Sequence, residues 1–177
     1  MLESADFLNN QAIELTSKGN FAEAIACYKR AITIERENHL LWFNLGITYQ
    51  KQGDLRGAKR ALLTAYDMNP EDAETIEQLA IVCLDRKEFY EAVQHCKSGL
   101  DLNPANAHLW NTLGVVFFNQ EEYDLAAEAF ERAVSVNPYY YDALYNLRDT
   151  YSELGNKAGE ADCASRLSKL KEPKEDL

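Results

Sequence analysis

The feature that most constrains this sequence is a repeat of 34 residues. Three Asn-Pro pairs follow that interval, with their prolines at Pro70, Pro104 and Pro138, and Trp42 and Trp110 lie two intervals apart. A small residue also recurs at one phase of the interval, at Ala12, Gly46, Ala80 and Gly114. A period of about 20 to 50 residues is typical of proteins built from stacked supersecondary units. The sequence therefore divides into five copies, at 5–38, 39–72, 73–106, 107–140 and 141–174.

Each copy contains two stretches of apolar residues at helical spacing. In the second copy, Trp42, Leu45 and Tyr49 mark the first stretch, and Ala58 and Leu62 lie in the second. Proline follows the second stretch in three copies, and it disfavours helical geometry in the residue before it. Each copy is therefore predicted to be a pair of helices.

The turn inside each pair is expected to need a residue that tolerates positive φ. Gly19, Gly53 and Gly155 lie at this point, and glycine adopts such a backbone without steric penalty. Lys87 and Glu121 hold the same phase in the third and fourth copies. Those two turns are predicted to form without glycine.

The second and fourth copies resemble the tetratricopeptide repeat (TPR), a unit of about 34 residues. The matching residues are Trp42, Leu45, Gly46, Tyr49, Ala58 and Pro70 in the second copy, and Trp110, Leu113, Gly114, Ala126, Phe130 and Pro138 in the fourth. The resemblance implies an all-α fold, an α-solenoid in which stacked antiparallel helix pairs form a right-handed superhelix. It also implies a single TPR domain over residues 1–177, whose last, strongly polar copy is the C-terminal cap.

In the TPR family, the first helices of the pairs line a concave groove that binds peptides. The family's groove phases correspond here to Asn9, Ile13, Phe43, Ile47, Lys51, Glu77, Ile81, Asp85, Asn111, Val115, Phe118, Asn119, Tyr145 and Asp149. These residues combine apolar and aromatic side chains with asparagines and a surplus of carboxylates. The resemblance therefore implies a scaffold or adaptor that binds an apolar, basic segment of another protein.

Two alternatives to this function stay open. In one, the exposed first-helix positions are merely solvated, and the isoleucines and valine pack within the layer of helices. In the other, the chain is a self-assembling module that forms homo-oligomers and has no dedicated peptide ligand. Binding of acidic chaperone tails is not expected, because the family's clamp positions, counted from the first copy, carry no basic residue. They hold Asn9, Ile13, Asn44, Glu74 and Gln78.

The charge of the chain disfavours several kinds of partner. It has 18 Lys and Arg against 29 Asp and Glu, a net charge of −11, whereas binding to phosphate backbones depends on Lys and Arg. Nucleic acid and membranes are therefore not expected partners. The acidic surplus is concentrated between Glu74 and Glu131. No apolar run approaches the length of a membrane span, and Glu3 and Asp6 stand where a secretion signal would be basic, so a cytoplasmic location is expected.

Residues that could carry catalysis or bind a metal form no recognisable motif. His39, His95 and His108 show no local motif that combines a nucleophile, a base and an orienting acid, so no enzyme is predicted. Cys83, Cys96 and His95 of the third copy are all residue types that bind zinc. Structural zinc takes four ligands, usually in close pairs, and that pattern is absent from the sequence. Both cysteines occupy core phases and are predicted to be buried thiols. There is no glycine-rich phosphate loop, and no cofactor is expected.

Overall fold

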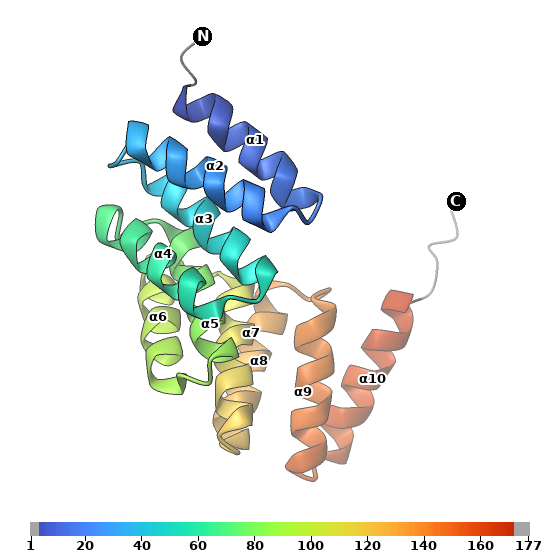
Figure 1. Ribbon diagram of the computed structural model, residues 1–177. Coiled ribbons are helices and arrows are strands. Elements are labelled where there is room, and N and C mark those ends of the chain that lie inside the picture. The colour runs from blue at the N-terminus through green and yellow to red at the C-terminus, as the bar shows by residue number, and fades with distance from the viewer. Residues whose placement is uncertain (1–3, 172–177) are drawn as a thin grey trace. The chain divides into compact units, whose positions relative to one another are not determined.

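The computed structural model describes residues 4–171, which form ten α-helices and no strand (Figure 1). The helices are α1 (Ala5–Ser17), α2 (Phe21–Ile34), α3 (His39–Gln52), α4 (Leu55–Met68), α5 (Ala73–Asp85), α6 (Phe89–Leu102), α7 (Ala107–Asn119), α8 (Tyr123–Val136), α9 (Tyr141–Glu153) and α10 (Lys157–Lys171). The first helices of successive pairs start 34 residues apart, and so do the second helices. The 34-residue period of the sequence is therefore also the period of the helices. None of these ten helices is long and apolar enough to cross a membrane.

The helices group into two compact units. Unit 1 (Met1–Glu88) holds α1 to α5, and unit 2 (Phe89–Leu177) holds α6 to α10. In unit 1, α1 packs on α2 and α3 on α4, and neighbouring pairs meet where α2 contacts α3 and α4 contacts α5. Unit 2 repeats this order with α7 on α8, α9 on α10, and contacts from α6 to α7 and from α8 to α9. The predicted all-α stack of helix pairs is confirmed. The single domain over 1–177 and the terminal cap stay predictions.

Short polar residues begin several of the helices. The Oγ of Ser4 accepts a hydrogen bond from the backbone N–H of Phe7 at 3.2 Å, before α1. At the start of α4, a carboxylate oxygen of Asp54 accepts from the N–H of Gly57 at 2.9 Å. These side chains satisfy N–H groups that have no partner within the helix, and each such cap stabilises its helix by about 1 kcal/mol.

The turns between paired helices adopt positive φ, with or without glycine. Gly19, Gly53 and Gly155 have φ of 79°, 90° and 68°. Lys87 and Glu121 take the same left-handed conformation, with φ of 59° and 61°. The conformation costs a residue with a Cβ roughly 1–2 kcal/mol. The two turns predicted to form without glycine therefore keep the backbone geometry of the others, at the expense of local strain.

Gly46 and Gly114, at the small-residue phase of the repeat, lie directly against a large side chain of the paired helix. A Cβ added at Gly46 would lie 2.7 Å from Cγ of Leu62, and one at Gly114 would lie 2.5 Å from Cε1 of Phe130. Leu62 is fully buried and Phe130 almost so. Within a close-packed core such an overlap forces side chains or backbone to move. The second and fourth pairs therefore need glycine at this phase, because Leu62 and Phe130 already fill the space that a side chain would take.

Candidate binding surfaces

The first-helix surface of unit 1 consists of the predicted groove positions on α1, α3 and α5. In unit 1, α3 contacts both α1 and α5. The Nδ2 of Asn44 donates to Oδ1 of Asn9 at 3.1 Å, across a sequence separation of 35 residues. The carboxylate of Asp85 accepts a hydrogen bond from Gln50, also 35 positions away. Side-chain bridges thus join neighbouring first helices at a spacing one residue longer than the repeat.

Apolar side chains of this surface differ in how far they are exposed. Ile13 is 47% exposed, whereas Phe43, Ile47 and Ile81 are half-buried. Phe43 also packs against the buried cluster of Ala58, Leu62, Leu79 and Val82. The surface is therefore an apolar strip of which part belongs to the core.

The charged residues of the same surface are mostly acidic. Lys51 is exposed on α3, and Glu77 and Asp85 lie on α5, with Glu77 half-buried. Partial burial raises the pKa of the Asp85 carboxyl, and the hydrogen bond from Gln50 opposes that rise. An electropositive ligand group placed beside Asp85 would favour its ionised form.

The first-helix surface of unit 2 consists of the predicted positions on α7 and α9. These helices are in contact, and Nδ2 of Asn146 donates to Oδ1 of Asn111 at 3.0 Å, again 35 residues apart. On α7, Nδ2 of Asn119 donates to the carbonyl of Val115 at 2.7 Å. The asparagines predicted to bond a peptide are thus already engaged within the protein. Asn9 and Asn111 use their amide oxygens, which leaves their Nδ2 groups as the donors for a ligand.

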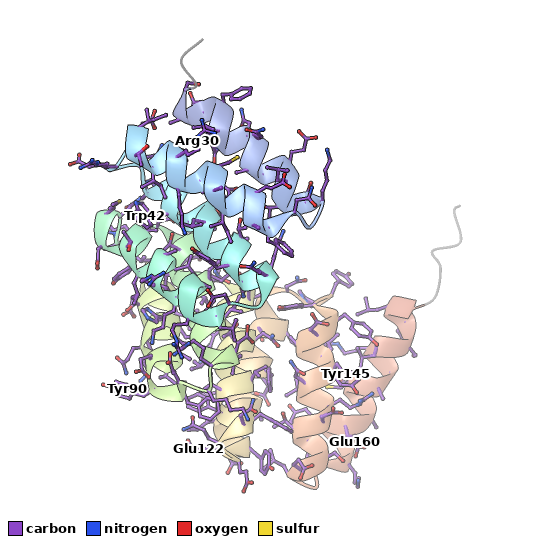
Figure 2. All side chains as sticks on the ribbon, in the orientation of Figure 1. Arg30, Trp42, Tyr90, Glu122, Tyr145 and Glu160 are labelled. Carbon is purple, nitrogen blue, oxygen red and sulfur yellow. The ribbon has the colours of Figure 1, made fainter. Side chains whose placement is uncertain are left out.

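The aromatic residues of this surface are held by polar and aromatic neighbours. Tyr145 is 43% exposed on α9 (Figure 2), and the guanidinium of Arg148 lies 4.3 Å from its ring centroid. A guanidinium nitrogen of Arg148 also donates to a carboxylate oxygen of Asp149 at 2.7 Å, which raises the pKa of Arg148. Phe118 meets Tyr123 edge-on, with ring centroids 5.3 Å apart. Arg148 therefore offsets the charge of Asp149, a role that the sequence analysis missed.

Buried thiols occupy the core of the described part of the chain. Cys83 and Cys96 are fully buried, and none of the four cysteines in residues 4–171 forms a disulfide. The prediction of buried thiols is confirmed. Among residues 4–171, no group of three or more His, Cys, Asp and Glu side chains is arranged to hold a metal ion.

An ion-pair cluster ties α4 to the end of α5 in unit 1. The Nζ of Lys59 lies 2.6 Å from one carboxylate oxygen of Glu88, and a guanidinium nitrogen of Arg86 lies 2.8 Å from the other. Hydrogen bonds from Arg86 and Lys59 lower the pKa of Glu88 to about 2. Glu88 therefore stays ionised wherever these two cations hold it.

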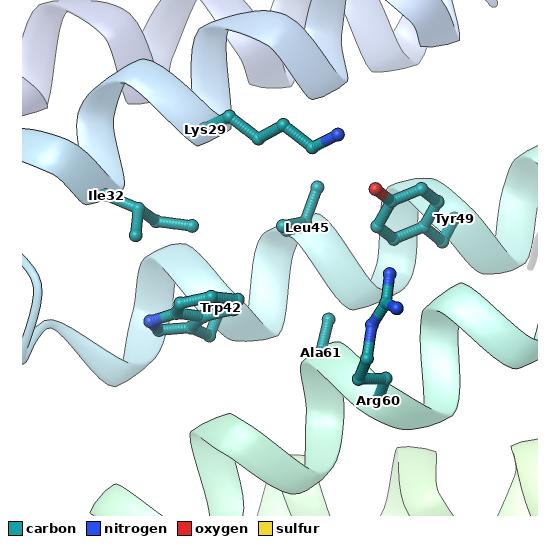
Figure 3. Close-up of a pocket in the computed structure, with 7 residues that line it drawn as sticks. All are labelled: Lys29, Ile32, Trp42, Leu45, Tyr49, Arg60 and Ala61. Atoms are coloured by element: carbon teal, nitrogen blue, oxygen red, sulfur yellow. The ribbon is translucent and has the colours of Figure 1, made fainter.

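A pocket of about 280 Å³ lies between α2, α3 and α4, and is called the Trp42 pocket below (Figure 3). Its lining comprises Lys29, Ile32, Trp42, Leu45, Tyr49, Arg60 and Ala61. The sequence does not indicate this pocket by itself, because Trp42, Leu45 and Tyr49 follow the helical spacing expected of residues that pack between helices. The signal that could have found it is the pair of cations, Lys29 and Arg60, on the two second helices that flank this aromatic stretch.

Comparison with known protein families identifies the repeat. A TPR repeat model matches residues 12–53, and tetratricopeptide repeat models match residues 43–107 and 107–140. The matches together run from residue 12 to residue 140. The chain belongs to the tetratricopeptide repeat family. TPR proteins are protein-interaction scaffolds that bind other proteins or peptides, and they are generally not enzymes.

Two curated relatives match this TPR chain over stretches of 83 and 75 residues. It is 36% identical over 83 residues to the TPR repeat-containing thioredoxin TTL4 of Arabidopsis thaliana, a match of 46% of the chain and 12% of the relative. It is 30% identical over 75 residues to the tetratricopeptide repeat-containing protein trd-1 of Caenorhabditis elegans, a match of 42% of the chain and 10% of that protein. The aligned stretch is thus a small part of both relatives.

Solved TPR structures show the same fold over nearly the whole chain. MamA 41-end from Desulfovibrio magneticus RS-1 superposes with a TM-score of 0.88 at 18% identity, covering 99% of both chains. A crystal structure of MamA protein gives 0.84 at 23% identity, covering 97% of this chain and 93% of the other. YrrB, described as a TPR protein with an unusual peptide-binding site, gives 0.74 at 20% identity, covering 95% and 87%. At these identities the likeness establishes the fold alone.

Proposed function

We propose that this chain is a scaffold or adaptor whose first-helix surfaces bind an apolar, basic segment of another protein. The observation that supports it most is the surface of unit 1, where Ile13 is 47% exposed and Ile47 and Ile81 are half-buried along adjacent helices. Burying such side chains against a partner removes apolar area from water, which is the main favourable term in most associations. Catalysis is not part of this proposal.

Electrostatics supports the basic character of the ligand. Residues 73–140 carry eleven Asp and Glu against four Lys and Arg. On α5, Glu74 and Asp85 are exposed. Lys51 on α3 is the cation among the predicted groove residues. Such a field attracts cations and raises their association rate in a way that falls with ionic strength. Binding of the ligand is therefore expected to weaken as salt increases.

The test measures the affinity of short fluorescent peptides that pair leucine with lysine, by fluorescence anisotropy at low and high salt. Ile13→Ser is expected to weaken binding several-fold, because it removes exposed apolar surface. Ile34→Ser is the matched control, since Ile34 is 52% exposed on the second helix α2. Equal loss of affinity in both variants would contradict the proposal.

A charge-reversal pair tests the electrostatic part. Glu74→Lys is expected to weaken binding about tenfold or more at low salt and less at high salt. Glu23→Lys makes the same change on an exposed position of α2 and is expected to have a smaller effect. An affinity unchanged by Glu74→Lys would contradict the proposed preference for basic ligands.

Self-assembly is the alternative function, and exposed apolar residues of unit 1 favour it. Phe7, Ile34 and Leu40 are each more than half exposed, and exposed apolar patches often mark protein contacts. Sedimentation velocity across a wide concentration range separates the two functions. If the protein stays monomeric at the highest concentration and still binds the peptide, the result supports the adaptor function over self-assembly.

A further inference from the structure

We propose that the Trp42 pocket is a second recognition site, which takes a large apolar side chain lying next to a carboxylate in an acidic segment of a partner protein. It goes beyond the proposed first-helix function and does not depend on it. Trp42, Leu45 and Tyr49 lie on the opposite side of α3 from Phe43 and Ile47, because each helical residue turns about 100°. The two sites also prefer ligands of opposite charge.

The walls of the pocket suit one large apolar side chain. Ile32, Trp42, Leu45 and Ala61 line it, and its volume is about 280 Å³, near the lower end of ligand pockets at roughly 300–1,000 Å³. The indole N–H of Trp42 donates to the carbonyl of Arg36 at 3.4 Å. Its single donor is therefore used within the protein, and the rest of the ring offers apolar surface to a ligand.

The other end of the pocket gathers three hydrogen-bond donors. Figure 3 shows the ammonium of Lys29, the hydroxyl of Tyr49 and the guanidinium of Arg60 around one end, while Ile32 and Trp42 lie at the other. Within residues 4–171, no acidic side chain pairs with Lys29 or Arg60, and no residue bonds the Tyr49 hydroxyl. Two cations beside a hydroxyl favour a carboxylate, which guanidinium binds in a bidentate geometry. Charge complementarity thus selects an acidic segment.

Unit 2 contains the same pocket positions but keeps one of the three donors, Lys97. The residues 68 positions further on are Lys97, Leu100, Trp110, Leu113, Phe117, Glu128 and Ala129. The apolar positions are kept, and the indole N–H of Trp110 donates to the carbonyl of Pro104 at 2.8 Å, as Trp42 does to Arg36. However, Phe117 replaces Tyr49 and Glu128 replaces Arg60. Since these helices pack with phenylalanine and glutamate, packing does not require the tyrosine and arginine of unit 1.

The two tryptophans allow a direct test by NMR. The chain contains two tryptophans, one at each set of positions, so ¹⁵N-labelled protein gives two indole resonances. N-acetyl-leucine carries an apolar side chain next to a carboxylate, whereas N-acetyl-leucinamide lacks the charge. We expect N-acetyl-leucine to shift the Trp42 resonance and not that of Trp110, and the amide to bind about tenfold more weakly. Equal shifts from acid and amide, equal shifts at both tryptophans, or no shift at Trp42 would each overturn the proposal.

Variants that exchange residues between the two sets sharpen the test. Tyr49→Phe with Arg60→Glu copies unit 2 into the Trp42 pocket and is expected to abolish the response of Trp42. Arg56→Glu is the control, because it makes the same charge change on α4 at an exposed residue that does not line this pocket. Phe117→Tyr with Glu128→Arg is expected to create a response at Trp110, where Lys97 is already present.

A last experiment distinguishes whether the Trp42 pocket binds a partner protein or a second copy of this chain. A short peptide with leucine between two aspartates is titrated against the full chain, beside the same peptide with asparagines in place of the aspartates. We expect the aspartate peptide to bind about tenfold or more tightly than its control. If sedimentation instead shows a dimer that Arg60→Glu dissociates, the occupant is another copy of the chain and the proposal fails.

Discussion

The Trp42 pocket of unit 1 has matching positions around Trp110 in unit 2. The apolar residues are kept between the two sets, and two of the polar residues differ. Both keep a tryptophan whose N–H bonds a backbone carbonyl six residues before it. Tyr49 and Arg60 of unit 1 are replaced by Phe117 and Glu128 in unit 2. Packing between helix pairs thus constrains the apolar residues, while the polar residues at the edge of the pocket can differ between units and so change which ligand is preferred.

The two units also differ in charge. Unit 1 has ten Lys and Arg against fourteen Asp and Glu, and unit 2 has eight against fifteen. The cations of unit 1 include Arg56, Lys59 and Arg60 on α4, where α8 of unit 2 carries Asp124, Glu128 and Glu131 with one arginine. Second helices at equivalent positions of the repeat thus carry charge of opposite sign.

The largest expected effect concerns the glycines at the small-residue phase, Gly46 in unit 1 and Gly114 in unit 2. Gly114→Ala is expected to lower the free energy of unfolding by about 2–3 kcal/mol, because its Cβ would overlap the ring of Phe130. Gly46→Ala is expected to cost less, roughly 1 kcal/mol, because Leu62 is more flexible than an aromatic ring. Urea denaturation followed by circular dichroism measures both. A smaller loss of stability at Gly114 than at Gly46 would contradict the argument that the Phe130 ring adapts less readily than Leu62.

Acid stability should distinguish Glu88 from its counterpart one repeat later, Glu122. Because Lys59 and Arg86 lower the pKa of Glu88 from about 4.5 to about 2, its contribution is present above pH 4.5 and is lost as the pH falls towards 2. After solvent screening, Glu88→Gln is expected to cost about 1 kcal/mol at pH 7.

The control is Glu122→Gln, since Val93 and Gln120 replace the two cations at the corresponding positions. It is expected to change stability little at any pH. The measurement is urea unfolding at several pH values between 2 and 7. A Glu88→Gln variant that is as stable as the wild type at neutral pH would argue against the ion-pair cluster.

The left-handed turns offer a stabilising change. Glu121→Gly is expected to raise the free energy of unfolding by roughly 0.5–1 kcal/mol, because glycine adopts φ near 61° without a Cβ penalty. Gly53→Ala, with φ of 90° in unit 1, is expected to be destabilising. Thermal unfolding of both variants checks the signs, and a stabilising alanine at Gly53 would refute the argument from backbone strain.

The smallest effect is expected at Arg148, which holds the small-residue phase of the last copy. Its guanidinium stacks on Tyr145 and pairs with Asp149 at the surface. Arg148→Ala is therefore expected to cost only about 0.5 kcal/mol. Ala164 stands where Leu62 and Phe130 occur in other copies. A loss of several kcal/mol in urea denaturation would show that Arg148 is part of the core.

Much of the first-helix surface could be predicted from residue types and spacing. The repeat places Ile13, Ile47 and Ile81 at one phase of the first helices, but only Ile13 is exposed, because exposure also depends on the neighbouring helices. The engagement of Asn9 by Asn44 could not be predicted, since it depends on the offset between two neighbouring helices. Likewise, the pairing of Arg148 with Asp149 and Tyr145 depends on rotamers that the periodicity does not specify.

The sequence alone determined the 34-residue period, the helix pairs and the position of each small residue, because these follow from local preferences and from spacing along one chain. Tertiary structure decided which side chains meet. Lys29 and Arg60 are 31 residues apart on separate helices, and they reach one pocket because α2 and α4 both pack against α3. Such a site arises from the geometry of three helices, and no pattern within a single helix contains it.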